Sequence, residues 1–375
     1  MASGGKSGKA GGFWQRLVGR VPEAPPSEPS TLPAVQQTHA PGATPPQART
    51  GTPPDLRDFE LGAEIGRGAM AVVYKATQRS TGRQVAVKRL SLSREFSAED
   101  LVDVRERFMR EARAAGALEH PDILQVVDAG QDGGDAWIAL EYVLGRDLSL
   151  FTKAGQLLPV REVVQLGVRL ARALHYAHSR GVIHRDIKPA NVMLDRVNGR
   201  LKLMDFGIAR VGDGSRTRTG LVLGTPSFMS PEQLAGLTVD GRSDLYSLAV
   251  LLYQLLTGTL PHQGDSMARL MQQIATEPAP DVRTHRPGLP ESLALVLAVA
   301  LEKRPELRYA SGEQMARDLE AVLVMDLQAE PATPETVPHD DPAFAQTLRL
   351  TVEEAGQNRR STAPGTEPPD PPLAS

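Results

Sequence analysis

The chain has 375 residues, of which 41% are apolar, and its net charge at pH 7 is −3. This length and apolar content suffice to bury the core of one large or two modest domains. The small negative charge provides no positive field for nucleic acid, and the complete absence of cysteine excludes disulfides, thiol nucleophiles and thiolate metal sites.

Residues 1–56 are dense in Pro, Gly, Ser, Thr and Ala and contain few large apolar side chains. Such a segment cannot bury enough surface to offset its ordering entropy, so we expect a disordered tail. One island interrupts it at Phe13–Val18, where Phe13 and Leu17 lie one helical turn apart among basic residues. Two interpretations stay open: a helix that docks on a partner or a membrane surface, or a short segment without function.

A glycine-rich segment follows at residues 65–73, with the sequence Ile-Gly-Arg-Gly-Ala-Met-Ala-Val-Val. Glycines in such a hairpin let backbone N–H groups approach phosphate oxygens. Ala71 stands where the Gly-x-Gly-x-x-Gly pattern has its third glycine, and even the intact pattern is a weak signal that also fits a plain hairpin turn. The strand-like run 84–88 comes next and ends in Lys88.

A helix is predicted over residues 107–118. Its apolar residues recur at helical spacing, at positions Phe108, Ala112, Ala115 and Leu118. Glu111 lies within this helix. Glu106 lies five residues earlier, off the face that Phe108 and Ala115 share, so a surface role fits it better.

Two short segments give the most specific signal: His184–Asn191, with the sequence His-Arg-Asp-Ile-Lys-Pro-Ala-Asn, and Asp205–Gly207, with Asp-Phe-Gly. A single Asp on a turn is more often a cap than a catalyst. Together the two segments space a proton acceptor and two metal-binding side chains as phosphoryl transfer requires.

Further segments extend the pattern towards the C-terminus. Residues 212–220 are too glycine-rich and polar to order themselves. Gly-Thr-Pro-Ser-Phe-Met-Ser-Pro-Glu at 224–232 and Arg-Ser-Asp-Leu-Tyr-Ser-Leu at 242–248 follow. Residues 326–375 are again rich in Pro and Thr, with added acid, and we expect a second disordered tail. A small apolar patch at Phe344–Val352 contains two threonines, Thr347 and Thr351, so this patch is a candidate phosphorylatable docking peptide.

In this order and spacing, the segments resemble the signature blocks of the eukaryotic-type (Hanks-type) serine/threonine protein kinases, and specifically the bacterial members of that family. The resemblance runs from about residue 59 to about residue 325. It implies an α+β, two-lobed protein-kinase fold over residues 57–325. A small, mostly antiparallel β-rich N-lobe with one regulatory helix would span 57–143, and a larger α-helical C-lobe would span 144–325. ATP and Mg²⁺ would bind between the lobes.

The resemblance also implies catalytic roles. Asp186 would orient and deprotonate the acceptor hydroxyl, and Lys188 would neutralise charge on the transferred phosphoryl group. Asn191 and Asp205 would hold Mg²⁺ on the nucleotide. A pseudokinase, which keeps the fold as a binding module or scaffold without turnover, usually lacks one of these residues or the lysine that corresponds to Lys88. All of them remain here, so we favour the enzyme.

The nucleotide site follows from the same resemblance. Lys88 and Glu111 would form the ion pair that positions the α- and β-phosphates, with Glu106 as the second candidate. The other expected contacts are the phosphate loop, the roof of the purine pocket, its gatekeeper and the hinge: Ile65, Gly66, Arg67, Gly68, Ala69, Val73, Ala86, Leu140, Glu141 and Val143. Most of the apolar residues among them also fit an ordinary core.

Substrate type and regulation are implied as well. Lys188 and Thr225 mark kinases that act on Ser and Thr rather than Tyr. The family pairs the arginine at Arg185 with a phosphate on the activation loop, so we expect autophosphorylation at Thr217 or Thr219 to order that loop. A small-molecule phosphotransferase of similar fold is less favoured, because such enzymes lack the segment 224–232.

Other family positions are architectural. Glu232 would pair with Arg308, and Asp244 would brace the backbone of the catalytic loop. The chain departs from the usual family residue at four positions, none of which has a proton-transfer or metal role: Ala71, Ser230, Ala249 and His262.

Location and partners are expected as follows. The substrates would be proteins with Ser or Thr acceptors, and dimerisation stays open. Many bacterial relatives carry a transmembrane helix, whereas the longest apolar run here, 293–301, is far shorter than the ~18 residues such a helix needs. We therefore expect a soluble protein. Because the implied reaction uses ATP, we expect it in the cytoplasm.

Overall fold

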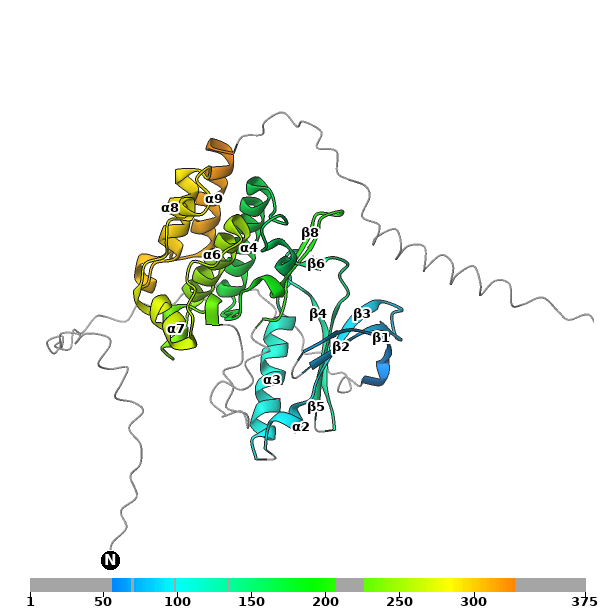
Figure 1. The fold of residues 1–375 in the computed structure, drawn as a ribbon. Helices are drawn as coiled ribbons and strands as arrows, with labels where there is room; N and C mark the ends of the chain where they lie inside the picture. Colours follow the sequence, from blue (N-terminus) through cyan, green and yellow to red (C-terminus); the bar gives the residue numbers. More distant parts are fainter. Residues whose placement is uncertain (1–55, 69–70, 98, 134, 207–225, 328–375) are drawn as a thin grey trace, which may run out of the picture. The chain divides into compact units, whose positions relative to one another are not determined.

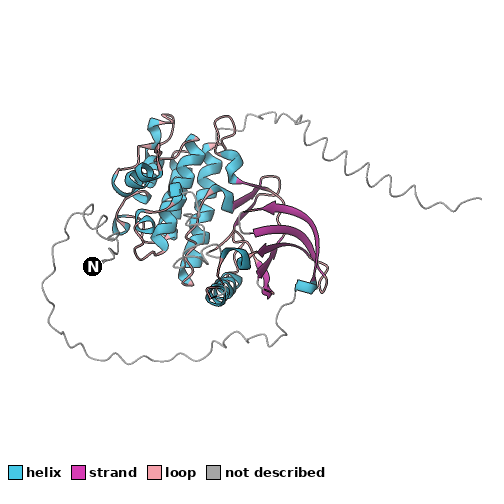
Figure 2. Cartoon of the chain, turned by 60° about the horizontal axis from the view of Figure 1, so that its bottom comes forward, coloured by secondary structure: helices cyan, strands magenta, loops and turns pink. Residues whose placement is uncertain are grey.

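An antiparallel sheet of five strands, in the order β1-β2-β3-β5-β4, forms the N-terminal part of the described chain. The computed structural model describes residues 56–68, 71–97, 99–133, 135–206 and 226–327. The strands are β1 (Phe59–Arg67), β2 (Ala71–Gln78), β3 (Gln84–Leu90), β4 (Val126–Asp132) and β5 (Asp135–Glu141), preceded by the 3₁₀ turn η1 (Leu56–Asp58). Figure 2 shows these strands gathered beside the helices. The predicted β-rich N-lobe is confirmed.

Strand β5 is buried on both faces. Trp137 and Ala139 pack with Phe59 in a small cluster on one face, where the Phe59 and Trp137 rings meet edge to face at 5.3 Å. Ile138 and Leu140, which alternate with them, belong to the main core on the other face. This double burial explains why residues 136–140 read as a continuous apolar run.

Helix α3 (Leu101–Gly116) packs against β4 and β5 (Figure 1). Its buried residues keep helical spacing, at Val104, Phe108, Ala112 and Ala115. The helix begins six residues before the predicted start, because the apolar spacing extends back to Val104. It is preceded by a short helix, α2 (Leu92–Glu95), that the sequence did not indicate. Glu106 is exposed, as expected for a surface residue.

The C-terminal part of the described chain is helical, and the predicted C-lobe is confirmed. Its helices are α4 (Val160–Ser179), α5 (Pro231–Leu234), α6 (Gly241–Thr257), α7 (Met267–Thr276), α8 (Glu291–Ala300) and α9 (Gly312–Met325). A small sheet joins them, with strands β6 (Arg146–Asp147), β7 (Val192–Asp195) and β8 (Arg200–Leu203). Short 3₁₀ turns complete this part: η2 (Leu148–Phe151), η3 (Pro189–Asn191), η5 (Pro226–Phe228), η6 (Val282–Thr284) and η7 (Pro305–Leu307).

Helix α6 is the centre of the C-lobe core. Its residues are buried without interruption from Ser243 to Tyr253, so solvent reaches no side of the helix there. Helices α4 and α8 pack on α6, and α9 packs on α4. Such burial on all sides requires apolar residues on every face of the helix, which 245–256 provides apart from Ser247 and Gln254.

The predicted tails, 1–56 and 326–375, lie outside the described residues apart from Leu56, Asp326 and Leu327. The proposed domain division therefore stays a prediction. Within the described ranges, no helix has the length and apolar content to cross a membrane.

Close packing between α4 and α9 gives a test of the fold. A Cβ on Gly312, the first residue of α9, would overlap the carbonyl oxygen of Ala171 and lie 3.1 Å from the nitrogen of His175. We expect Gly312→Ala to lower the free energy of unfolding by about 1–3 kcal/mol, because backbone must shift to admit the methyl group. Urea denaturation measures this, with Gly288→Ala as the control, since a Cβ there meets nothing within 4 Å. Equal midpoints for the two variants would contradict the expectation.

Candidate active site

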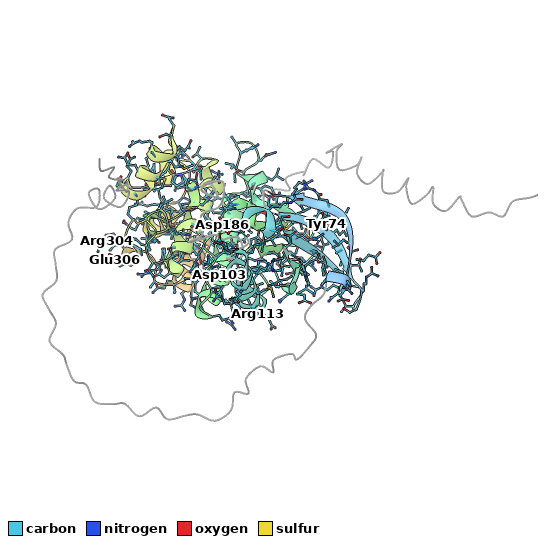
Figure 3. The ribbon with its side chains drawn as sticks, turned by 90° about the horizontal axis from the view of Figure 1, so that it is seen from below. Tyr74, Asp103, Arg113, Asp186, Arg304 and Glu306 are labelled. Atoms are coloured by element: carbon cyan, nitrogen blue, oxygen red, sulfur yellow. The ribbon has the colours of Figure 1, made fainter. Side chains whose placement is uncertain are left out.

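Three predicted catalytic side chains meet at Asp186, which is labelled in Figure 3. Its carboxylate accepts hydrogen bonds from Lys188 Nζ at 2.7 Å and from Asn191 Nδ2 at 2.9 Å. Asn191 Nδ2 also donates to the carbonyl oxygen of Asp186 at 2.7 Å. The turn η3, which begins at Pro189, brings Asn191 back to Asp186. Both amide hydrogen bonds fix Asn191, and its side-chain oxygen stays available as an acceptor.

Lys88 and Asp205 form an ion pair that joins the two lobes. The ammonium of Lys88, on β3, lies 2.8 Å from Oδ1 and 2.9 Å from Oδ2 of Asp205. Asp205 has a φ of 60°, in the left-handed region that non-glycine residues seldom adopt. The predicted pairing of Lys88 with Glu111, which is half-buried on α3, stays a prediction.

His184 connects the catalytic loop to the segment that carries Asp205. Its Nδ1 accepts the N–H of Asp186 at 3.2 Å, so the ring proton is on Nε2, which donates to the carbonyl oxygen of Met204 at 2.7 Å. Complete burial lowers the pKa of His184, outweighing the raising effect of nearby carboxylates. The ring also lies 4.6 Å from that of Phe206. The neutral His184 side chain thus links the segment that contains Asp186 to the segment that contains Asp205.

Asp244 braces the catalytic loop, as predicted. Its carboxylate accepts the N–H groups of His184 at 2.8 Å and Arg185 at 2.7 Å, and it contacts Nε2 of His178 at 2.7 Å. Arg185 has a φ of 66°, a conformation that costs energy for a non-glycine residue. The contacts from Asp244 and a hydrogen bond from Gln233 to the carbonyl oxygen of Arg185, at 2.9 Å, hold it there.

Gln233 was missed in the sequence although a signal was present. Ser230 caps α5 and forms a reciprocal capping box with Gln233, whose Oε1 accepts the N–H of Ser230 at 3.0 Å. The spacing Ser-x-x-Gln before a helix is the signature of this box. Ser230, one of the four departures from the family pattern, therefore orients the side chain that supports Arg185.

The predicted pair of Glu232 and Arg308 is confirmed. Arg308 Nη1 and Nη2 lie 2.7 and 2.8 Å from the two carboxylate oxygens, and both side chains are almost fully buried. Burial alone would raise the pKa of Glu232, but hydrogen bonds from Arg308 and Ser243 and the charge of Arg308 hold that pKa below its usual value. The pair joins α5, which contains Glu232, to Arg308 directly after η7.

The residues predicted to form the roof and gatekeeper of the purine pocket lie on four neighbouring strands, β1, β2, β3 and β5. Ala86 lies opposite Leu140 in the register of β3 and β5, and Val73 lies opposite Lys88. Ile65 is 47% exposed, as a residue at the rim of a ligand site would be. The predicted hairpin is present between β1 and β2, with Gly68 N–H donating to the carbonyl oxygen of Ala71 at 2.8 Å.

Two charged residues of the predicted nucleotide site have protein partners. Arg67 donates through Nε to Glu64 at 2.9 Å on the exposed strand end. The carboxylate of Glu141 contacts Lys202 Nζ at 2.6 Å and accepts a hydrogen bond from the N–H of Gln125 at 2.9 Å. The N–H of Glu141 donates to the carbonyl oxygen of Gln125 at 2.9 Å. Its carboxylate is therefore a structural group, and a contact between Glu141 and the purine would have to come from the backbone.

His262, another departure from the family pattern, contacts Lys303. It is buried and accepts a hydrogen bond from Lys303 at 3.0 Å, while Lys303 also donates to the carbonyl oxygen of Ile274. Burial and the neighbouring ammonium lower the pKa of His262 to about 4, and burial lowers the pKa of Lys303 to about 8.

Several other predicted positions lie outside the described residues: Ala69, Thr217, Thr219, Thr225, Phe13–Val18 and Phe344–Val352.

The chain has extensive similarity to known proteins. Residues 59–319 match the family model described as the protein kinase domain. A probable serine/threonine-protein kinase of Streptomyces coelicolor is 44% identical over 276 residues, which are 71% of this chain and 40% of that protein. The serine/threonine-protein kinase PknB of Mycolicibacterium smegmatis is 41% identical over 72% of this chain and 43% of its own length.

A solved structure supports the same fold. The crystal structure of Rad53 residues 1–466 in complex with AMP-PNP superposes with a TM-score of 0.58, at 25% identity, covering 70% of this chain and 65% of that one. The chain spans about two fifths of the length of the curated relatives described above. The family match nevertheless covers well over half of the chain. The chain therefore belongs to the protein kinase family, in its bacterial eukaryotic-type (Hanks-type) serine/threonine branch.

Proposed function

We propose that this protein transfers the γ-phosphoryl group of ATP to Ser and Thr hydroxyls of protein substrates. The observation that carries this proposal is the pair of linked centres at the active site: Asp186 held by Lys188 and Asn191, and Asp205 held by Lys88. The relatives' printed names, serine/threonine-protein kinases, support the acceptor class. Membership of the family implies ATP as a substrate and use of a divalent metal ion.

Asp186 is the proposed proton acceptor. Its carboxylate has two oxygens, of which Oδ2 receives both described side-chain hydrogen bonds. Oδ1 is therefore the atom we assign to the substrate hydroxyl. Lys188, at 2.7 Å from Oδ2, places a positive charge where the transferred group would develop negative charge.

Mg²⁺ is the proposed metal ion, with Asn191 and Asp205 as its protein ligands. A carboxylate and an amide oxygen are hard donors of the type that Mg²⁺ prefers. The backbone carbonyl oxygen of Asn191 accepts the N–H of Met204 at 2.8 Å. Since Met204 directly precedes Asp205, this backbone hydrogen bond connects the two proposed ligand residues. The donor types therefore fit Mg²⁺. When bound, the metal ion would neutralise charge on the nucleotide phosphates.

The remaining site residues are proposed to bind the nucleotide. Lys88 and Glu111 would position the phosphates, the hairpin residues 65–69 would cover them, and Val73, Ala86 and the hinge 141–143 would enclose the purine. We place the reaction in the cytoplasm, where ATP is available. Autophosphorylation at Thr217 or Thr219, dimerisation and docking through Phe13–Val18 stay predictions.

Transfer from labelled ATP tests the proposal. With MgCl₂ and a generic basic protein as acceptor, we expect label in the acceptor, and acid hydrolysis should release phosphoserine and phosphothreonine without phosphotyrosine. Omitting the divalent ion should abolish labelling. A protein that binds ATP without transferring label would instead be a pseudokinase. Label that enters only a small molecule would also contradict the proposal.

A further inference from the structure

The segment between α3 and β4 is fastened to the C-lobe by an ion pair. Asp122, whose side chain is 10% exposed, contacts Nη2 of Arg169 and accepts a hydrogen bond from its Nε at 3.2 Å. Arg169 lies on α4 and donates through Nη1 to the carbonyl oxygen of Gly199 at 3.0 Å. The guanidinium therefore connects the N-lobe segment with both α4 and the turn before β8.

A second ion pair lies close to the first. Lys202 on β8 contacts Oε1 of Glu141 at 2.6 Å, and the two side chains are 14% and 18% exposed. Lys202 Nζ also donates to the carbonyl oxygen of Ile123 at 3.2 Å, and Gln125 N–H donates to the carboxylate of Glu141 at 2.9 Å. Glu141 ends β5, where the hinge begins, so this pair ties the hinge to the C-lobe.

Backbone hydrogen bonds join the two pairs. The N–H of Leu203 donates to the carbonyl oxygen of Asp122 at 2.8 Å, and the N–H of Leu124 donates to the carbonyl oxygen of Leu203 at 2.9 Å. Strand β8 leads directly to Asp205, which binds Lys88. One continuous set of contacts thus connects the purine side of the proposed site with its metal side.

We infer that Arg169 and Lys202 are positioning residues for nucleotide binding. With Asp122 and Glu141 they form an interlobe clamp, which holds the hinge 141–143 at a fixed distance from Asp205. This inference rests on the proposed use of ATP. A nucleotide must contact the hinge directly and Asp205 through the metal ion at the same time. Relative motion between the hinge and Asp205 would therefore have to be lost when the nucleotide binds, and this loss would lower its affinity. Neither residue is assigned a contact with the nucleotide, and chemistry at Asp186 does not involve them.

Loss of a clamp cation should therefore weaken nucleotide binding more than turnover. We expect Lys202→Met to raise KM for ATP and the dissociation constant for Mg·ATP by about 5- to 20-fold, with kcat within about twofold. Lys202→Arg, which keeps the charge, should recover most of the affinity. Titration calorimetry gives the dissociation constant without any turnover.

Arg172→Met is the matched control. Arg172 lies on α4 one turn after Arg169 and pairs with Glu320 of α9 at 2.7 Å, within the C-lobe alone. Its loss should leave both KM and the dissociation constant within about twofold of the parent's.

The other clamp cation is tested with two variants. Arg169→Met leaves the poorly exposed Asp122 carboxylate without its cation, so this variant is compared with Asp122→Asn/Arg169→Met, which removes both charges. We expect weaker binding in each that folds, as judged by thermal unfolding.

The outcomes separate this inference from the proposed function. If the parent transfers phosphate and Lys202→Met keeps the parental KM and dissociation constant, the clamp is wrong and the function stands. A parent that binds Mg·ATP in a Lys202-dependent way but transfers no phosphate would keep the clamp and overturn the function. Equal weakening by Arg172→Met, or a parent that binds no nucleotide, would overturn the clamp.

Discussion

Replacing Asp186 by Asn is expected to lower kcat by about 10²–10⁴-fold, because an amide cannot accept the proton of the substrate hydroxyl. The side-chain oxygen that remains can still accept the hydrogen bonds from Lys188 and Asn191. Folding and nucleotide binding should therefore change little. Steady-state phosphorylation of a protein acceptor gives kcat, and a thermal unfolding curve shows whether the fold is intact.

Asp195→Asn is a suitable control for this variant. Asp195 accepts N–H groups of Val197 and Asn198 at 3.1 Å in the turn between β7 and β8, a role that Asn also performs. Its kcat should remain within about twofold of the parent's, because the side-chain hydrogen bonds described for Asp195 stay within residues 195–198. The proton-acceptor assignment would be wrong if Asp186→Asn retained kcat within tenfold while Asp195→Asn behaved as expected.

The catalytic centre could be predicted because its parts are close in sequence. Asp186, Lys188 and Asn191 lie within one short segment, and Pro189 fixes the 3₁₀ turn that brings them together. The same holds for the hairpin 65–73, where glycines indicate the turn and alternating residues indicate the strands. The pair of Glu232 and Arg308, far apart along the chain, followed only from the resemblance to a known family.

Pairs that are distant in sequence and lack a family pattern could not be predicted. Nothing in the spacing of Asp122 and Arg169 distinguishes them from solvated surface charges, and only the packing of α4 beside the segment before β4 makes them partners. His262 and Lys303 present the same problem, since a half-buried lysine beside a buried histidine has no periodic signature. The start of α3 was missed for another reason: the interval between Val104 and Phe108 contains only charged residues.

The second large effect is expected on stability. Glu232→Gln should lower the free energy of unfolding by about 3–5 kcal/mol, because it leaves the Arg308 guanidinium buried without a counter-charge. Arg308 keeps two close carbonyl acceptors, Glu302 at 2.7 Å and Lys303 at 2.9 Å, so we expect the lower end of this range. Urea denaturation at neutral pH measures the loss.

Three comparisons make this stability test specific. Glu306→Gln removes the acid of an exposed pair with Arg304, labelled in Figure 3, and should have no measurable effect. Glu232→Gln/Arg308→Met removes both buried charges and should be more stable than Glu232→Gln alone, as replacing a buried pair by neutral side chains costs less than breaking it.

The third comparison is the pH dependence. The pKa of Glu232 is lowered in the folded protein, so the stabilisation from its carboxylate is complete above the unfolded pKa and is lost as the pH falls through the folded pKa. The difference in free energy of unfolding between the parent and Glu232→Gln should thus be constant at neutral pH and shrink in acid. A difference that grew on acidification would show that the Glu232 carboxylate destabilises the folded protein, contrary to the ion-pair geometry.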